Sequence, residues 1–320
     1  MYRRVDISYK TIIFTILVLL GLGILYFIRG IIMELFIAFL LMTVLEPLVG
    51  LFERLKLKRG LSVLITYVLV IGVVGGVIAL IAPILVQQTT NFVSAFPGYL
   101  KNIGIDISQI SGLTSGIFDQ LSGVLNFTFS VFSNALSVVT ILAFSFYMLL
   151  GYAGLRNQFI NLLGQERGEK ISKTIGIIKE KLGQWSRAEL LLMFVVALGN
   201  YIGYLILKIP YALPLAVLTG IFEIVPTLGP IISAIPAVLI GFGISPLTGV
   251  GAVAVTFIVN QLENYVLVPR IMQKSAGVSP LLVLISIAVG AKLAGVTGAI
   301  IAIPFVVSLQ AIIKEFWGKE

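Results

Sequence analysis

Two glutamates stand in stretches of sequence that are apolar enough for the interior of a membrane. Glu223 follows the run LAVLTGIF, and Glu263 lies within the segment NQLENYVLVP. In that segment Asn260 and Asn264 are one helical turn apart and share a face beside Glu263, with Gln261 close by. Ionisable groups at membrane depth are costly and usually functional. These five residues can coordinate a cation, share a proton or bind a polar solute; a purely structural polar clamp between helices is the alternative.

The sequence lacks the residues that most enzymes and metal sites use. It contains no cysteine, so thiolates are absent. It also contains no histidine, which is the commonest metal ligand and the usual general base. The usual catalytic sets of an intramembrane enzyme are missing as well. We therefore predict no catalytic residue, no metal site, no cofactor and no enzymatic activity, with H⁺ or Na⁺ as the candidate coupling ion.

The composition is typical of a membrane protein. Of the 320 residues, 58% are hydrophobic and 11% are charged, whereas about a quarter of the residues of a soluble domain are charged. Residues 61–100, 120–155 and 224–262 contain no charged side chain, and each stretch exceeds the roughly 20 apolar residues that cross a bilayer as a helix. The sequence predicts an all-α polytopic membrane protein with about eight membrane segments. The net charge of +8 fits basic cytoplasmic loops, so no nucleic-acid partner is expected.

Hydropathy and charge divide the chain into four regions. Three spans are followed by a more polar stretch, which predicts a small extramembrane lobe of short amphipathic helices. A fourth span precedes a basic helix with one apolar stripe, formed by Ile171, Ile175, Ile178, Leu182 and Trp185. This helix is expected on the cytoplasmic membrane surface, on a neighbouring subunit or on the protein's own core. The regions are residues 1–85 (three spans), 86–128 (the extracytoplasmic lobe), 129–187 (the fourth span and the amphipathic helix) and 188–320.

Basic residues indicate the orientation of the chain. With the N-terminus inside, the predicted cytoplasmic segments hold 18 of the 22 lysines and arginines, in agreement with the positive-inside rule. We predict a multi-pass protein of the cytoplasmic membrane with both termini in the cytoplasm.

The C-terminal region contains a repeat. The segment PLAVL recurs as PLLVL, and IISAIPAV recurs further on as AIIAIPFV. A long apolar helix precedes each copy, over about 188–207 and 249–268. Five of the prolines in this region are expected to shape its interrupted segments: Pro214, Pro236, Pro269, Pro280 and Pro304.

Proline and glycine interrupt both copies of the repeat. A continuous helix through VPTLGP is unfavourable, and the freed backbone groups cannot face lipid, so they must be buried in protein or line a wet cavity. We predict two re-entrant hairpins, over about 211–243 and 279–313; two ordinary spans with proline kinks are the alternative. The predicted hairpin tips contain Pro226, Gly229, Pro230, Gly290, Gly295 and Gly298. Counting spans gives the two copies opposite orientations, and inverted repeats with broken helices are typical of secondary transporters.

Several ordered segments resemble one family of membrane proteins. These are LEPLV at 45–49, PTLGPIISAIP at 226–236, QLEN at 261–264, VPRIM at 268–272 and SPLLVL…GAKLAGVTGAIIAIP at 279–304. Together they resemble the AI-2E transporter family, the autoinducer-2 exporter-like permeases. The resemblance implies about eight spans, a prokaryotic cytoplasmic membrane and secondary transport. The family positions that match are Pro226, Gly229, Pro230, Glu263, Pro269, Gly295, Gly298 and Pro304.

Motifs and resemblance together predict a secondary transporter that exports a small polar solute such as autoinducer-2 by alternating access, coupled to a proton or cation gradient. Glu223 is expected to carry the coupling ion, and the Asn260–Asn264 cluster to hold the solute. One alternative is a Na⁺(Li⁺)/H⁺ antiporter, and another is a non-transporting scaffold or sporulation-type assembly factor. The expected partners are the lipid bilayer, a small polar solute or monovalent cation, and further copies of the chain in a homo-oligomer.

Overall fold

The computed structural model describes residues 9–104, 135–226, 228–272 and 279–317, and within these ranges the chain forms helices and turns without any strand. The all-α prediction is therefore confirmed. Most of the predicted extracytoplasmic lobe, and Thr227 in the first predicted tip, lie outside the described residues. The helices are α1 (Tyr9–Phe27), α2 (Arg29–Arg54), α3 (Arg59–Asn102), α5 (Ala135–Leu163), α6 (Gln165–Ile206), α7 (Ala212–Phe222), α8 (Leu228–Ile244), α9 (Pro246–Leu262), η1 (Glu263–Leu267), α10 (Val268–Met272) and α11 (Pro280–Trp317).

Six described helices are long and apolar enough to cross a membrane, or seven if the bent helix α5 counts as one span. Three further apolar helices are shorter, and all three come from the predicted hairpins: Ala212–Phe222, Gly229–Ile244 and Leu281–Gly295. The chain is thus a multi-pass membrane protein. The count of eight membrane segments and the re-entrant course of the hairpins stay predictions.

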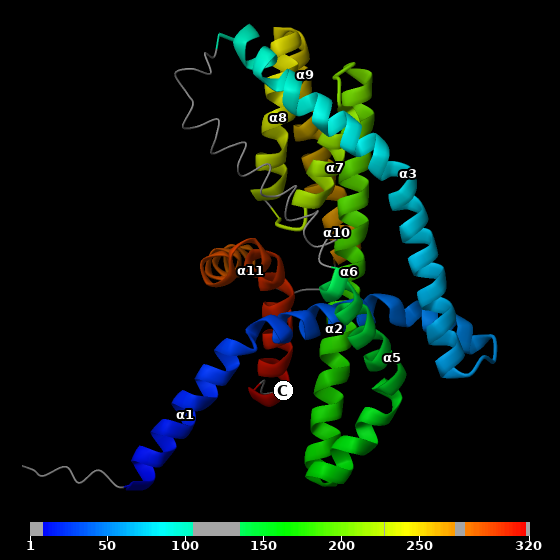
Figure 1. Cartoon of the computed structure of the whole chain (residues 1–320), viewed down its shortest axis with the longest axis vertical. Helices are drawn as coiled ribbons and strands as arrows, with labels where there is room; N and C mark the ends of the chain where they lie inside the picture. Colours follow the sequence, from blue (N-terminus) through cyan, green and yellow to red (C-terminus); the bar gives the residue numbers. More distant parts are fainter. Residues whose placement is uncertain (1–8, 105–134, 227, 273–278, 318–320) are drawn as a thin grey trace, which may run out of the picture.

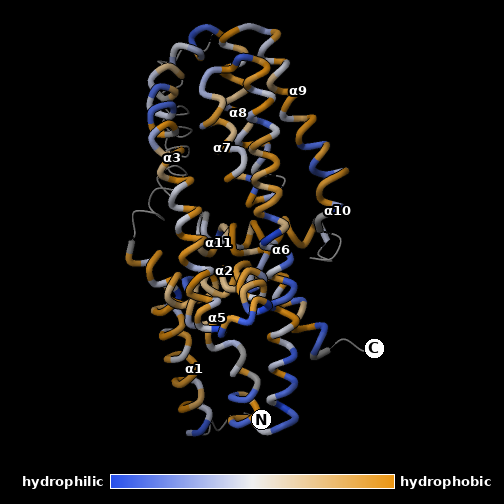
Figure 2. The backbone as a smooth tube through the Cα atoms, turned by 90° about the vertical axis from the view of Figure 1, so that its right-hand side faces the viewer, coloured by the Kyte–Doolittle hydropathy of each residue, from blue (hydrophilic) through white to orange (hydrophobic). Residues whose placement is uncertain are grey.

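Helix α6 forms the axis of the molecule (Figure 1). It contacts α2, α5, α7, α9, α10 and α11. No proline lies between Gln165 and Ile206, so the predicted amphipathic helix and the span after it form one helix of 42 residues. Figure 2 shows that the end of α6 next to α5 is hydrophilic and that its course beyond is mainly apolar.

Helix α3 is also longer than expected. It continues through Pro83 to Asn102, so the first part of the predicted lobe extends the third span. Its C-terminal end packs Phe92, Phe96 and Leu100 against Tyr204 of α6 and Ile209 of the α6–α7 turn. The Asn102 side chain donates a hydrogen bond to the carbonyl oxygen of Gly243 at 3.2 Å. The end of α3 therefore lies beside the α6–α7 turn and the end of α8 (Figure 1).

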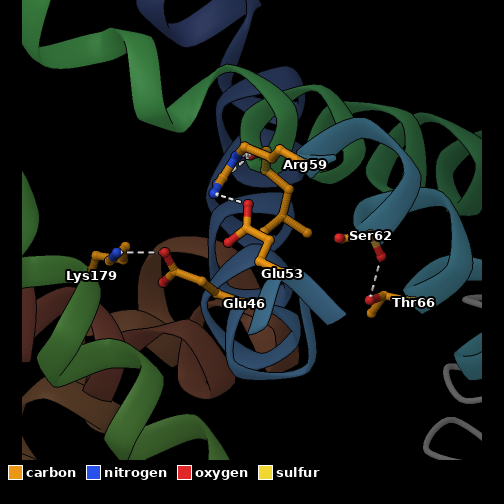
Figure 3. Close-up of polar contacts among 7 residues, drawn as sticks. Glu46, Glu53, Arg59, Ser62, Thr66 and Lys179 are labelled. Carbon is orange, nitrogen blue, oxygen red and sulfur yellow. Dashed lines mark hydrogen bonds and ion pairs between the residues drawn. The ribbon is translucent and has the colours of Figure 1, made fainter. Parts of the chain in front are cut away.

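Ion pairs connect α2 to its neighbours (Figure 3). Lys179 Nζ of α6 lies 2.7 Å from Glu46 Oε1 of α2. Arg59 at the start of α3 lies 3.1 Å from Glu53 Oε1 and also donates to the carbonyl oxygen of Leu149 in α5 at 2.7 and 3.0 Å. The first pair holds α2 against α6, and the contacts of Arg59 join α2, α3 and α5.

The first predicted hairpin consists of α7 and α8, which contact each other across the short break between Phe222 and Leu228. A Cβ atom at Gly229 would lie 1.9 Å from the carbonyl oxygen of Phe222. Glycine is therefore required where the second arm turns back over the end of the first.

The second predicted hairpin is α11, which is bent at Ala294 and Gly295. Gly295 has φ +61°, a conformation that side chains other than glycine's disfavour. The arm before the bend contacts the arm after it at Gly290 and Gly298. A Cβ atom on Gly298 would lie 2.0 Å from the carbonyl oxygen of Gly290. Each repeat thus contains a break with a close backbone contact, as the proline and glycine pattern predicted.

We expect Gly298→Ala to destabilise the protein by about 1–3 kcal/mol, because the added methyl group must push the two arms apart. Gly75→Ala is the matched control, since its Cβ atom would have no neighbour within 4 Å and alanine favours a helix by up to about 1 kcal/mol over glycine. Thermal unfolding in detergent measures both. Equal unfolding midpoints for the two variants would contradict the backbone contact.

Candidate functional site

A cavity of about 810 Å³, open on one side, lies between α6, the α7–α8 break, α8, α9 with η1 and α10, and α11. Most of its described wall is apolar. The larger apolar side chains on it are Trp185, Leu192, Ile231, Val253, Phe257 and Ile303. A cavity of this volume is in the range of small-molecule binding sites.

Three glutamates form the polar part of the wall. Glu189 comes from the middle of α6, Glu223 follows the last residue of α7, and Glu263 is the first residue of η1. Their exposed fractions are 4%, 2% and 6%. Within the described residues none of the three has a basic ion-pair partner, and Oε2 of each has no hydrogen-bond partner. All three therefore offer unused acceptor atoms inside the protein.

The carboxyl groups of Glu223 and Glu263 are close enough to interact, and each also interacts with Glu189. Two ionised carboxylates repel each other strongly in a buried site, whereas a pair that holds one proton between its two groups avoids this repulsion. The arrangement therefore suits a carboxyl pair that shares a proton, with a third carboxyl nearby.

A π-helical turn presents Glu263 to the cavity. η1 interrupts the helix between α9 and α10, and such turns in longer helices occur frequently at functional sites. Asn260 and Asn264 also line the cavity, and the Asn264 side-chain amide donates to the Asn260 carbonyl and side-chain oxygens at 2.9 and 2.8 Å. The two amides are thus held together beside Glu263, on one face as expected.

The structure places the other predicted residues in different surroundings. Gln261 is not among the described residues of the cavity wall, whereas Pro226, Pro230 and Pro269 are. Gly229 packs under the first break. The second bend, with Gly290, Gly295 and Gly298, supplies no residue to the described wall. Of the remaining prolines, Pro214, Pro236 and Pro304 are buried within helices and Pro280 begins α11.

Glu189 was not predicted. The apolar stripe of α6 ends at Trp185, and Glu189 follows four residues later on the same face. Since the sequence was divided into an amphipathic helix and a separate span at this point, the continuation of the stripe through Glu189 was missed. A carboxyl group on the buried face of a long helix was the available signal.

Comparison with known proteins assigns the chain to a family. Residues 13–318 match the protein family that is described as "AI-2E family transporter". The chain belongs to the AI-2E transporter family. This confirms the resemblance found in the sequence.

The relatives have names that assign transport only provisionally. Transport protein YueF of Bacillus subtilis is 29% identical over 316 residues, covering 91% of this chain and 84% of YueF. Transport protein YrrI of the same organism is 27% identical over 308 residues, covering 89% and 85% of the two chains. Permease PerM of Escherichia coli is 26% identical over 340 residues, covering 98% and 96%. Family and relatives together support a membrane transporter.

We expect Glu263→Gln to leave the stability at neutral pH unchanged or raised, because the glutamine amide can donate to Glu223 and removes an ionisable group from the interior. Glu46→Gln is the contrast, since it leaves Lys179 without its ion-pair partner and should lower stability by about 1 kcal/mol. Unfolding midpoints in detergent at pH 7 measure the difference. A loss in Glu263→Gln as large as that in Glu46→Gln would assign Glu263 to a structural clamp.

Proposed function

We propose that this protein is a secondary active transporter that exports a small organic solute through the cavity in exchange for protons. One observation carries the proposal: two buried carboxyl groups, those of Glu223 and Glu263, lie together on the wall of a cavity of solute size in a multi-pass protein of a transporter family. Broken helices that meet at a central site are the general architecture of such transporters.

The carboxyl pair would serve as the proton carrier. An unpaired carboxylate costs on the order of several kcal/mol in a protein interior, so loss of the shared proton must be compensated by another positive group. A solute or ion that enters the cavity supplies that compensation. Proton release and cargo binding are then alternatives at one site, which is the requirement for antiport.

Alternating access would come from the broken segments. Ile287, Ile303 and Val307 of α11 pack with Leu182 and Trp185 of α6 in one buried cluster. Val225, in the α7–α8 break, packs against the same cluster. This apolar layer lies between the cavity and the hydrophilic end of α6, so the first break and both arms of α11 would meet at a gate on that side.

Na⁺(Li⁺)/H⁺ antiport is the second candidate. The carboxylates and the oxygen atoms of Asn260 and Asn264 are hard donors of the type that alkali cations prefer. An experiment on proton movement separates this function from solute export.

We expect proteoliposomes containing the protein to move protons when a transported cargo is added outside. An internal pH indicator would report this movement with NaCl, LiCl and a panel of small organic solutes, autoinducer-2 included. Glu223→Gln and Glu263→Gln should reduce the response to that of empty liposomes. The control Glu53→Gln, which lies outside the cavity, should retain it. Wild-type rates in both cavity variants would remove the pair from the mechanism, and a response to Na⁺ or Li⁺ alone would favour the cation antiporter. No response to any cargo would favour the scaffold.

We place both termini in the cytoplasm, on the strength of the distribution of basic residues. Because the chain has no cysteine, single cysteines report the two sides of the membrane. Leu247→Cys in the first turn of α9 should react with an impermeant maleimide on intact cells, and Lys58→Cys in the α2–α3 turn should react only after permeabilisation. The reverse pattern would invert the proposed topology.

A further inference from the structure

The charge of the cavity wall has one sign. Among the described residues that line the cavity there are three glutamates and no lysine or arginine. Two bases of α6 are engaged elsewhere: Arg187 donates to the carbonyl oxygen of Thr43 at 2.8 Å, and Lys179 pairs with Glu46. An anionic cargo would therefore meet only like charge.

The three glutamates lack partners within the described chain. Each is more than nine-tenths buried, lines the cavity and has an Oε2 atom without a hydrogen-bond partner. Buried acceptors in folded proteins are normally satisfied. A cationic group bound against this wall would supply a partner that the described chain does not.

The rest of the wall excludes a bare metal ion as the best-fitting cargo. In the described chain no three acidic residues are spaced to hold a metal ion, and apolar walls cannot replace a hydration shell. The cavity volume of about 810 Å³ and the Trp185 ring on its wall instead suit an organic body. Tryptophan is also the aromatic side chain that attracts organic cations best.

We propose that the cargo of this transporter is a monovalent organic cation with an apolar body, and that Glu189 is the third carboxyl of its binding site. The proposal rests on the proposed function and specifies its cargo. When the cation binds, the proton of the Glu223–Glu263 pair leaves, so one positive charge replaces another. The exchange is electroneutral, with one proton moved for each cation.

Trp185 itself can test the charge selection, without any transport. The chain has two tryptophans, so Trp317→Phe leaves Trp185 as the only indole, and its fluorescence reports which solutes reach the cavity. In lipid nanodiscs we expect quenching by neutral acrylamide and by Cs⁺. Iodide should quench less than Cs⁺ by roughly tenfold, because a cavity lined by one sign of charge concentrates counter-ions to about this extent or more.

The controls are built on the same single-tryptophan background. Glu189→Gln combined with Glu223→Gln and Glu263→Gln should abolish the preference for Cs⁺, whereas Glu46→Gln combined with Glu53→Gln, outside the cavity, should keep it. Equal quenching by Cs⁺ and iodide in the parent would overturn the proposal. So would a failure of acrylamide to reach Trp185.

Transport of matched aromatic solutes completes the test. Benzyltrimethylammonium, benzyl alcohol and benzoate share a ring and differ in charge. Of the three solutes, only benzyltrimethylammonium should move protons out of proteoliposomes, at one proton per cation. On the Trp317→Phe background, Glu189→Gln should weaken the binding of benzyltrimethylammonium at least about tenfold, as expected when a charge contact loses its partner. Proton movement with benzyl alcohol or benzoate, together with quenching of Trp185 by iodide, would contradict an organic cation as cargo but would still support the transport function. Cation-selective quenching without any proton movement would instead leave the site and remove the transport function.

Discussion

Burial of three carboxyl groups that have no basic partner in the described chain is the constraint around which the C-terminal region is organised. Such groups are stable in a protein interior only when protonated or when a cation lies beside them. The three glutamates occupy three different kinds of position: Glu189 lies in the middle of an uninterrupted helix, Glu223 follows the end of a short helix, and Glu263 begins a π-turn. Because each position belongs to a different element, the site exists only while these elements are packed together.

Helix α6 supplies the fixed part of that packing. It contacts the N-terminal helices through the Lys179–Glu46 pair and the cavity elements through its later turns. The broken segments pack against it on the cavity side, at Leu182 and Trp185. A continuous helix beside interrupted ones gives the molecule a rigid reference against which the interrupted ones can change position.

Sequence reasoning found the fold class, the two interrupted segments and four of the polar residues on the cavity wall because these depend on local features. Proline and glycine near Pro226 and Gly295 are incompatible with an ordinary helix, and the structure breaks or bends there. The one-turn spacing of Asn260 and Asn264 placed both on one face. The sequence did not indicate the π-turn that begins at Glu263, because no local pattern specifies it. Glu189 was missed because the amphipathic part of α6 and its apolar part differ in composition, and a change of composition does not by itself end a helix.

The contact between Gly290 and Gly298 limits how the second broken segment can move. Backbone meets backbone there, with no side chain between the arms that could change rotamer and let them slide. Separating the arms would open a gap along the whole crossing, whereas turning them together costs nothing at the crossing itself. The bent segment is therefore a single stiff elbow, whose two arms keep their position relative to each other.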